Sequence, residues 1–245
     1  MHLGLAEARA LMEAVTAGQG ATQSLSIVLF PPATALASLA AGRRKGDPGL
    51  GAQNCHAEPK GAFTGEISAE QVRDAGATCV LVGHSERRRL FGENDSLLQA
   101  KLRAAWRAGL TPYLCVGETL AERERQETRD VLARQLRRAL EGAPPRAPLT
   151  VAYEPVWAIG TGVVAAPGEV AEAHGWVREE LAATGRDDVE SVPVLYGGSV
   201  DSRSAVPLSA LPDVDGFLVG GASLTAASFL AIAKALEESR PAARR

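Results

Sequence analysis

Short apolar runs alternate with longer amphipathic segments along this chain. Runs rich in Val, Leu or Ile predict seven strands, at 26–30, 50–54, 79–83, 112–117, 150–156, 192–198 and 216–221. Between them, apolar residues recur at three-and-four spacing, as in 96–109 and 131–142, which predicts helices. Apolar strands separated by helices are typical of a parallel sheet covered by helices. The pattern predicts an α/β protein, either a closed barrel or an open doubly wound sheet.

The chain shows no internal domain boundary. Its 245 residues suit one large α/β domain as well as two small ones. No change of composition and no low-complexity linker divides it, and the Pro-containing stretch 142–149 is typical of a helix-to-strand connection. We therefore expect a single domain over 1–245.

Composition narrows the possible functions. With 46% hydrophobic and 22% charged residues, the chain has enough apolar material for a sizeable core. A formal net charge of -3 speaks against a nucleic-acid or membrane partner, and no apolar run reaches the roughly 18 residues of a membrane span. Cys55, Cys79 and Cys115 lack the spacing of a metal site and are expected to be reduced thiols. These features favour a cytoplasmic protein with a small-molecule partner.

The positions of unusual residues distinguish the barrel from the open sheet. Glu154, His84 and the glycine pairs at 197–198 and 220–221 all lie at or just beyond the carboxyl ends of predicted strands. Both architectures carry function at that end. An open nucleotide-binding sheet should also carry a GxGxxG or GxxxxGKS loop, and the sequence contains neither. We therefore predict a barrel.

Glu154 is a candidate general base. It follows an apolar strand that Pro155 ends, and desolvation at a strand end can raise the basicity of a carboxylate. For an isolated glutamate, a solvated strand-end acid is the commoner interpretation. The following residues, WAIGTG at 157–162, add apolar cover, two glycines and backbone N–H groups able to bind an anion. Together they predict a base followed by a closing loop.

His84 is a candidate hydrogen-bond donor. It follows the strand 79–83 and precedes a predicted short helix, whose N-terminal amides disfavour the imidazolium and keep the ring neutral. A satisfied loop histidine is the alternative for a lone residue. The remaining histidines have no partners visible in the sequence and are expected to be structural or exposed: His2, His56 and His174.

The last two predicted strands end in paired glycines, in LYGGSV (195–200) and LVGGAS (218–223). Paired glycines let the backbone approach a phosphate closely, and the loops after the final barrel strands commonly bind one. Each pair alone could be a tight turn. Their occurrence on successive strands predicts a phosphate site.

Several long segments resemble the triosephosphate isomerase family in order and spacing: QNCHAEPKGAFTGEIS, VGHSERR, LCVGE, VAYEPVWAIGTG, LYGGSV and DGFLVGGASL. The similarity runs from the first predicted helix to the last. It implies a (β/α)8 TIM barrel that interconverts dihydroxyacetone phosphate and D-glyceraldehyde 3-phosphate through an enediolate, in glycolysis and gluconeogenesis. It also implies that the reaction needs neither a metal nor an organic cofactor.

The resemblance assigns roles to individual residues. Glu154 would remove the proton and His84 would polarise the carbonyl oxygens, as in the well-studied enzymes of that family, and Glu86 matches a carboxylate of the active-site neighbourhood. Phosphate-binding positions are Gly160, Ser199, Gly220 and Gly221. The loop that closes over the substrate would comprise Trp157, Ala158, Ile159, Gly160, Thr161 and Gly162. The segment 55–68, with Thr64 near its tip, resembles an arm that enters a neighbouring subunit and implies a homodimer.

One departure from the family concerns its first strand, which ends in Asn-Trp-Lys-Met. This sequence begins at Met1-His2, which resembles the tail of that motif, so seven of eight strands are visible and the asparagine and lysine are missing. The other lysines are not expected to face the site: Lys45, Lys60, Lys101 and Lys234. Either translation starts upstream and the native protein is an ordinary isomerase, or the chain is short and is a weakened isomerase or a non-catalytic triose-phosphate-binding barrel. Loss of the cation should cost several kcal/mol of transition-state stabilisation.

Overall fold

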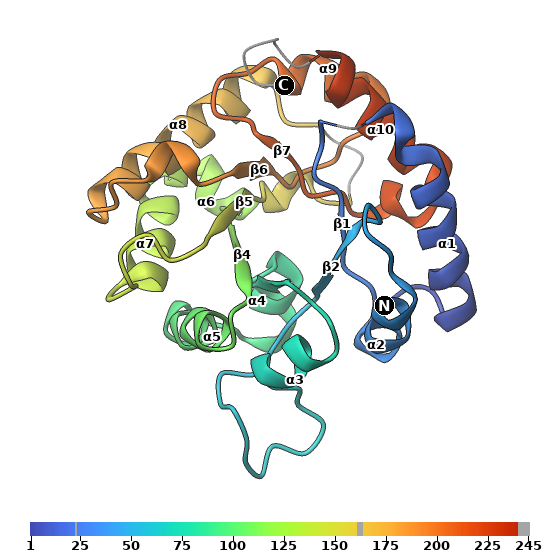
Figure 1. Ribbon diagram of the computed structural model, residues 1–245. Helices are drawn as coiled ribbons and strands as arrows, with labels where there is room; N and C mark the ends of the chain where they lie inside the picture. The colour runs from blue at the N-terminus through green and yellow to red at the C-terminus, as the bar shows by residue number, and fades with distance from the viewer. Residues whose placement is uncertain (23, 161–163, 240–245) are drawn as a thin grey trace.

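The computed structural model describes residues 1–22, 24–160 and 164–239, and a curled parallel sheet lies at its centre (Figure 1). Each strand pairs in parallel with the next one along the chain, in the order β1-β2-β3-β4-β5-β6-β7. The strands are β1 (Val28–Leu29), β2 (Gly49–Ala52), β3 (Cys79–Val82), β4 (Thr111–Val116), β5 (Thr150–Tyr153), β6 (Val194–Tyr196) and β7 (Gly216–Phe217). The predicted parallel α/β sheet is confirmed.

Helices form an outer layer around the strands (Figure 1). They are α1 (Leu5–Gly18), α2 (Ala33–Gly42), α3 (Ala69–Asp74), α4 (Ser85–Phe91), α5 (Asp95–Arg107), α6 (Leu120–Glu124), α7 (Thr128–Leu140), α8 (Pro167–Ala183), α9 (Ser202–Ser209) and α10 (Ala226–Ser239). Short 3₁₀ turns follow β5 and β7, at η2 (Val156–Ala158) and η4 (Gly221–Leu224). The helices predicted at 96–109 and 131–142 are confirmed as α5 and α7. Across the described ranges, no helix has the length and apolar character needed to cross a membrane.

The two faces of the sheet pack differently, as the period of two along a strand requires. One set of alternating strand residues joins the large core beneath the helices, including Val80, Val82, Leu114, Val116, Val151 and Val194. The other set forms a small inner cluster of Leu81, Cys115 and Ala152, with Phe30, Tyr113, Leu195 and Leu218 partly buried against it. The core is therefore concentrated between the sheet and its helical layer.

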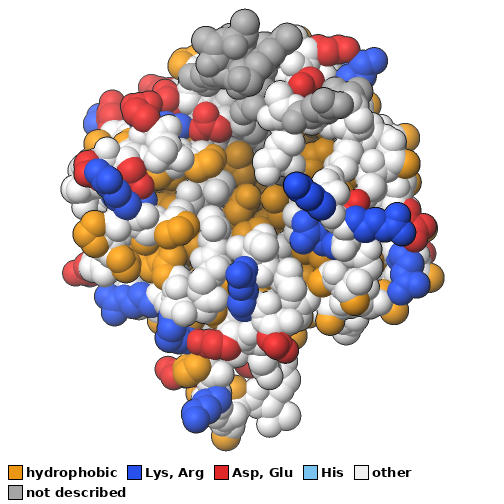
Figure 2. Space-filling view, viewed as in Figure 1, with side chains coloured by type: hydrophobic (Ala, Val, Ile, Leu, Met, Phe, Trp, Pro, Cys, Tyr) orange, Lys and Arg blue, Asp and Glu red, His pale blue; other side chains and the backbone are white. Residues whose placement is uncertain are grey.

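The outermost strands are shorter than the sequence predicts. Runs at 26–30 and 216–221 yield only two strand residues each, and both residues of β1 are only partly buried. An edge strand has a hydrogen-bonding neighbour on one side only, which explains the shorter ladders. Within the described ranges the sheet has β1 and β7 as its two edges. Figure 2 shows hydrophobic side chains gathered at the centre of one face, surrounded by charged groups.

Candidate active site

The structure brings Glu154 and His84 into contact. Glu154 directly follows β5, and His84 is the N-cap of α4, just after β3. His84 Nε2 lies 3.1 Å from Glu154 Oε1, and the Ser85 backbone N–H donates to Glu154 Oε2 at 2.8 Å. The two candidates of the sequence analysis therefore form a pair, although strand β4 separates the strands that carry them.

The carboxylate of Glu154 is almost completely removed from solvent. The residue is 2% exposed, and this burial raises the pKa of its carboxyl group. The nearby His84 ring and the hydrogen bond from Ser85 N act in the opposite direction, but burial is the larger effect. A carboxylate whose pKa is raised accepts a proton more readily, which suits a general base.

Hydrogen bonds at His84 select one tautomer of its ring. The backbone N–H of Glu86 donates to His84 Nδ1 at 3.3 Å. A ring nitrogen that accepts a hydrogen bond carries no proton, so in the neutral ring the proton is on Nε2, which faces Glu154. The Glu86 side chain is 66% exposed, with its Oε2 4.0 Å from Nδ1, on the other side of the ring from Glu154. This arrangement directs an N–H donor toward the Glu154 carboxylate.

The turn that carries His84 is held by both backbone geometry and Arg88. Gly83 has φ 76°, and a Cβ at that position would lie 2.6 Å from Leu98 Cδ1, so the turn requires glycine. Arg88 donates to the carbonyl oxygens of Gly83 and Cys115, at 3.0 and 3.1 Å, and to Asp95 at 2.6 Å. These contacts tie the end of β3 to the end of β4 and fix the position of the imidazole.

A second buried carboxylate, Glu118, anchors the segment that follows Glu154. Trp157 Nε1 donates to Glu118 Oε1 at 2.8 Å, and the Tyr153 hydroxyl lies 3.1 Å from the same oxygen. Glu118 is fully buried, and burial raises the pKa of its carboxyl group. Glu118 ends the segment LCVGE, and its role was not predicted from the sequence. Its position directly after an apolar strand, like that of Glu154, was the signal available.

The predicted phosphate-binding residues lie beyond β5, β6 and β7. Gly160 has φ 69°, a conformation that favours glycine, and Ser199 Oγ donates to the Ala158 carbonyl oxygen at 2.7 Å. Gly220 is the N-cap of η4, and Gly221 is its first residue. At each of these three glycines, an added Cβ would meet no atom of the described residues within 4 Å, chain neighbours aside. The described part of the chain therefore leaves room for a ligand beside them.

The predicted closing loop is only partly described. Ala158 is buried, whereas Trp157 and Ile159 are partly buried. Thr161 and Gly162 lie outside the described residues.

The other glycine pair, 197–198, has a packing role. A Cβ at Gly197 would lie 2.9 Å from Glu154 Cγ, and one at Gly198 would lie 2.1 Å from the Tyr196 hydroxyl oxygen. A larger residue at either position would displace its neighbours. This pair therefore allows the loop after β6 to pack closely around Glu154.

The segment 55–68 projects from the body between β2 and α3 (Figure 1). His56 packs against Phe63, with ring centroids 4.3 Å apart, and its backbone N–H donates to Ile67 O at 2.8 Å. Phe63 is 43% exposed, and Thr64 near the tip is also exposed. The arm thus presents apolar surface away from the candidate site.

The lysines occupy other parts of the molecule. Lys101 is buried in α5, where it donates to Glu93 at 2.6 Å and to Asn54 at 2.7 Å. Lys60 lies in the projecting arm, and Lys45 precedes β2, near the amino end of that strand. Lys234 in α10 lies 3.7 Å from Glu238. Within the described ranges, no group of three or more His, Cys, Asp or Glu side chains is placed to hold a metal ion.

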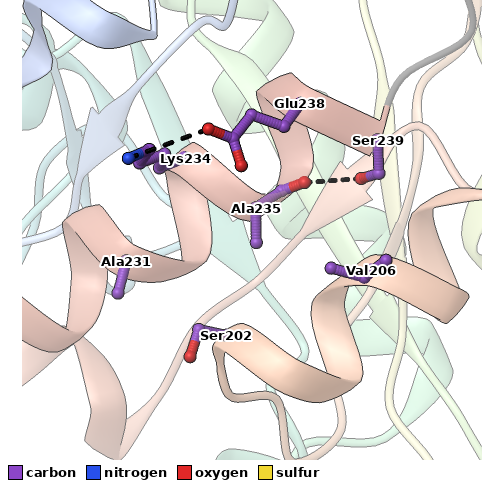
Figure 3. A pocket seen from close by; sticks show the side chains of 7 residues that line it. All are labelled: Ser202, Val206, Ala231, Lys234, Ala235, Glu238 and Ser239. Atoms are coloured by element: carbon purple, nitrogen blue, oxygen red, sulfur yellow. Dashed lines mark hydrogen bonds and ion pairs between the residues drawn. The ribbon is translucent and has the colours of Figure 1, made fainter.

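A hollow of about 500 Å³ lies on the outside of the helical layer, between α9 and α10 (Figure 3). Its lining residues are Ser202, Val206, Ala231, Lys234, Ala235, Glu238 and Ser239. The Ser239 hydroxyl donates to Ala235 O at 2.5 Å, and Lys234 pairs with Glu238. None of the predicted site residues lines this hollow, so it is separate from the candidate active site.

A buried carboxylate and an imidazole in contact at the carboxyl ends of nearby parallel strands are typical of barrel enzymes, which carry their active sites at this end. Comparison with known proteins identifies a family within the class of barrel enzymes. The family model described as triosephosphate isomerase matches residues 1–236, and the chain belongs to the triosephosphate isomerase family.

Individual relatives agree with this assignment. Triosephosphate isomerase of Xanthobacter autotrophicus is 47% identical over 234 residues, covering 95% of this chain and 92% of the relative. That of Symbiobacterium thermophilum is 47% identical over 243 residues, covering 98% and 95%. A crystal structure of triosephosphate isomerase from Bartonella henselae matches with a TM-score of 0.87 and 38% identity, over 96% of this chain and 95% of that one. The predicted TIM-barrel fold and family resemblance are confirmed.

Proposed function

We propose that this chain is a triosephosphate isomerase that interconverts dihydroxyacetone phosphate and D-glyceraldehyde 3-phosphate. The observation that carries the proposal is the buried Glu154 carboxylate, 3.1 Å from His84 Nε2, in a member of this family. The reaction moves one proton between adjacent carbons while a carbonyl group and a hydroxyl group exchange places. It therefore needs one base beside the carbons and one donor beside the oxygens.

In the proposed mechanism, Glu154 takes the proton from the carbon next to the carbonyl group. The electron pair of the broken C–H bond forms the enediolate, and His84 Nε2–H stabilises the charge that develops on oxygen. Glu154 then returns the proton to the neighbouring carbon. The hydroxyl proton passes from one substrate oxygen to the other through His84 Nε2, so that the carbonyl and hydroxyl groups exchange places. To act, the carboxylate must exchange its contacts with Ser85 N and His84 for contact with the substrate. We assign the backbone N–H of Glu86 the role of positioning the His84 ring.

We assign phosphate binding to Gly160, Ser199, Gly220 and Gly221. Support comes from the open space beside the three glycines and from the bond between Ser199 and Ala158, which places the hydroxyl beside the segment after the base. Backbone N–H groups at such turns bind anions without a side-chain cation. The segment that begins at Trp157 would cover the bound phosphate.

We further propose that residues 1–245 form a single domain that acts as a homodimer in the cytoplasm. The exposed apolar side chains of Phe63 and Ile67 on the projecting arm support an interface there, because solvent-exposed apolar groups gathered on one feature commonly mark a contact surface. Thr64 would enter the neighbouring subunit.

Steady-state conversion of D-glyceraldehyde 3-phosphate by the purified chain tests the proposed function. We expect turnover by the wild-type chain and a decrease in kcat of about 10³-fold in Glu154→Gln, which cannot accept the proton. Because burial raises the pKa of Glu154, the acid limb of kcat/KM should lie above the ordinary value for a glutamate.

The matched control is Glu179→Gln in α8, whose exposed side chain pairs with exposed Arg129 of α7 and which should leave kcat unchanged. A wild-type chain that is folded but does not turn over the substrate would overturn the proposed function. Full activity in Glu154→Gln would remove the assignment of the base.

A further inference from the structure

Arg123 in α6 contacts three separate parts of the barrel. Its guanidinium carbon lies 4.4 Å from the centre of the Trp157 ring. Its Nη1 lies 3.7 Å from Glu118 Oε1, and its Nη2 pairs with Glu169 Oε1. These partners come from the end of β4, the segment after Glu154 and the first turn of α8. One side chain therefore connects elements that are distant in the sequence.

Two of these contacts lie at opposite ends of the segment that links β5 to α8. Trp157 stands at its beginning, in η2. At its end, Glu169 Oε2 accepts a hydrogen bond from Ala166 N at 2.8 Å, at the start of α8. Arg123 therefore contacts the indole at one end and, through Glu169, the helix start at the other.

The chemistry of the contacts suits arginine and not lysine. A planar guanidinium can stack on an indole while its N–H groups donate to carboxylates that lie in the plane of the guanidinium. Glu118 is fully buried, and its carboxylate also accepts the Trp157 N–H. The charge of Arg123 favours the anionic form of Glu118, which is the better acceptor for that N–H.

We propose that Arg123 is a positioning residue for the isomerase reaction, holding Trp157 and the start of α8 in a fixed relation. The proposal rests on the proposed function. Its connection to the site is short: Trp157 follows closely after Glu154, and the next residue, Ala158, accepts the hydrogen bond from Ser199. Loss of Arg123 should disturb the segment beside the proposed phosphate site and leave the contact between Glu154 and His84 intact.

The experiment compares Arg123→Met and Arg123→Lys with Arg125→Met. Arg125 is a matched control because its exposed side chain pairs with exposed Glu127, away from Trp157. In Arg123→Met we expect kcat/KM to fall about tenfold, with the acid limb of its pH profile unchanged. Arg123→Lys should recover only part of this loss, because it keeps the charge but not the stacking. Arg125→Met should match the wild type.

A second variant, Glu169→Gln, separates positioning from loss of folding. Glutamine can still accept the hydrogen bond from Ala166 N, so α8 keeps its N-terminal contact while the ion pair with Arg123 is lost. We expect a loss of kcat/KM smaller than that of Arg123→Met, with an unchanged thermal unfolding midpoint.

Fluorescence gives a readout that does not depend on turnover. With Trp106 and Trp176 replaced by phenylalanine, emission comes from Trp157, and Arg123→Met should shift it to longer wavelength and increase quenching by acrylamide. An unchanged Trp157 spectrum, kcat/KM within twofold of wild type, or an equal loss in Arg125→Met would overturn the proposal. If the wild-type chain has no activity, the proposed function fails, and the emission still decides whether Arg123 holds the indole.

Discussion

The middle of the sheet and its edges are held together in different ways. The ladder between β3 and β4 and the ladder between β4 and β5 each join four residue pairs, whereas those at β1–β2 and β6–β7 join two. Every residue of β3 and β5 is buried, and neither residue of β1 is. The pair of Glu154 and His84 sits on the middle strands. The proposed proton transfer thus depends on the strands with the longest ladders. Much of the proposed phosphate binding depends on β6 and β7, whose ladders are shorter.

Side-chain contacts compensate for the short ladder on the β6–β7 side. Arg178 in α8 donates to the carbonyl oxygens of Val189 and Val192 at 2.7 and 2.6 Å, and to Asp215 at 2.6 Å. The same carboxylate oxygen of Asp215 accepts the Val194 backbone N–H at 2.8 Å. An arginine with several acceptors therefore fixes the start of both strands. The β6–β7 side of the sheet is therefore held by polar contacts, whereas the middle strands are held by apolar packing and strand pairing.

The largest expected effect is on kinetics: substitutions on the middle strands should lower kcat, whereas a substitution on the β6 side should raise KM. His84→Ala removes the donor on the middle strands and should lower kcat about 10³-fold, because the charge on oxygen is no longer stabilised. Ser199→Ala on the β6 side should act mainly by raising KM, by about tenfold, because it weakens substrate binding. Steady-state kinetics on both variants measure kcat and KM separately. A kcat loss in Ser199→Ala as large as that in His84→Ala would contradict the division of roles.

A smaller effect is expected on stability. Leu114 in β4 is fully buried, so Leu114→Ala should cost about 3 to 4 kcal/mol of unfolding free energy. Leu29 in β1 is only partly buried, and Leu29→Ala should cost less than half as much. Urea unfolding followed by circular dichroism measures both values. Equal losses would show that the edge is packed as tightly as the middle.

The smallest expected effect concerns His174, which links the two regions. Its ring packs edge-on against Tyr153 of β5, and its Nδ1 lies 2.8 Å from Asp213 O, just before β7. Burial lowers the pKa of His174 from 6.5 to about 4. Between these values the unfolded chain binds a proton that the folded chain does not. Stability should therefore be complete above pH 6.5 and fall by about 2 to 3 kcal/mol toward pH 4.

Urea unfolding across pH 4 to 7 isolates this contribution. His174→Gln keeps a donor for Asp213 O but does not titrate, so its stability should depend less on pH than that of the wild type. His2→Gln is the control, since His2 is exposed. Equal pH dependence in His174→Gln and wild type would exclude His174 as the cause.

The sequence predicts the sheet better than the site. All seven strands lie within the predicted runs or within a residue of them, because buried parallel strands are apolar throughout and are bounded by turn residues. Strand lengths were overestimated at the two edges, where a strand has a neighbour on one side only, and also at β5 and β6. Glu154 and His84 were singled out from their strand-end positions, but the contact between them is tertiary and no local pattern contains it.

Glu118 and Arg123 show why the rest could not be predicted. Arg123 belongs to LAERE, a short polar segment whose charges are typical of a solvated helix face. Only the folded structure places its guanidinium over Trp157 and beside a buried carboxylate. Functional contacts made by charged residues on short helices depend on what packs nearby.

The glycines around Glu154 also define where this barrel could be redesigned. A Cβ at Gly117 would lie 1.8 Å from the Glu154 carbonyl oxygen, and one at Gly197 would crowd its side chain, whereas Gly220 and Gly221 face open space. In a saturation library aimed at altered substrates, nearly every substitution of Gly117 or Gly197 would prevent correct folding. At 220 and 221 the same library would sample new shapes for the proposed phosphate site while leaving Glu154 in place.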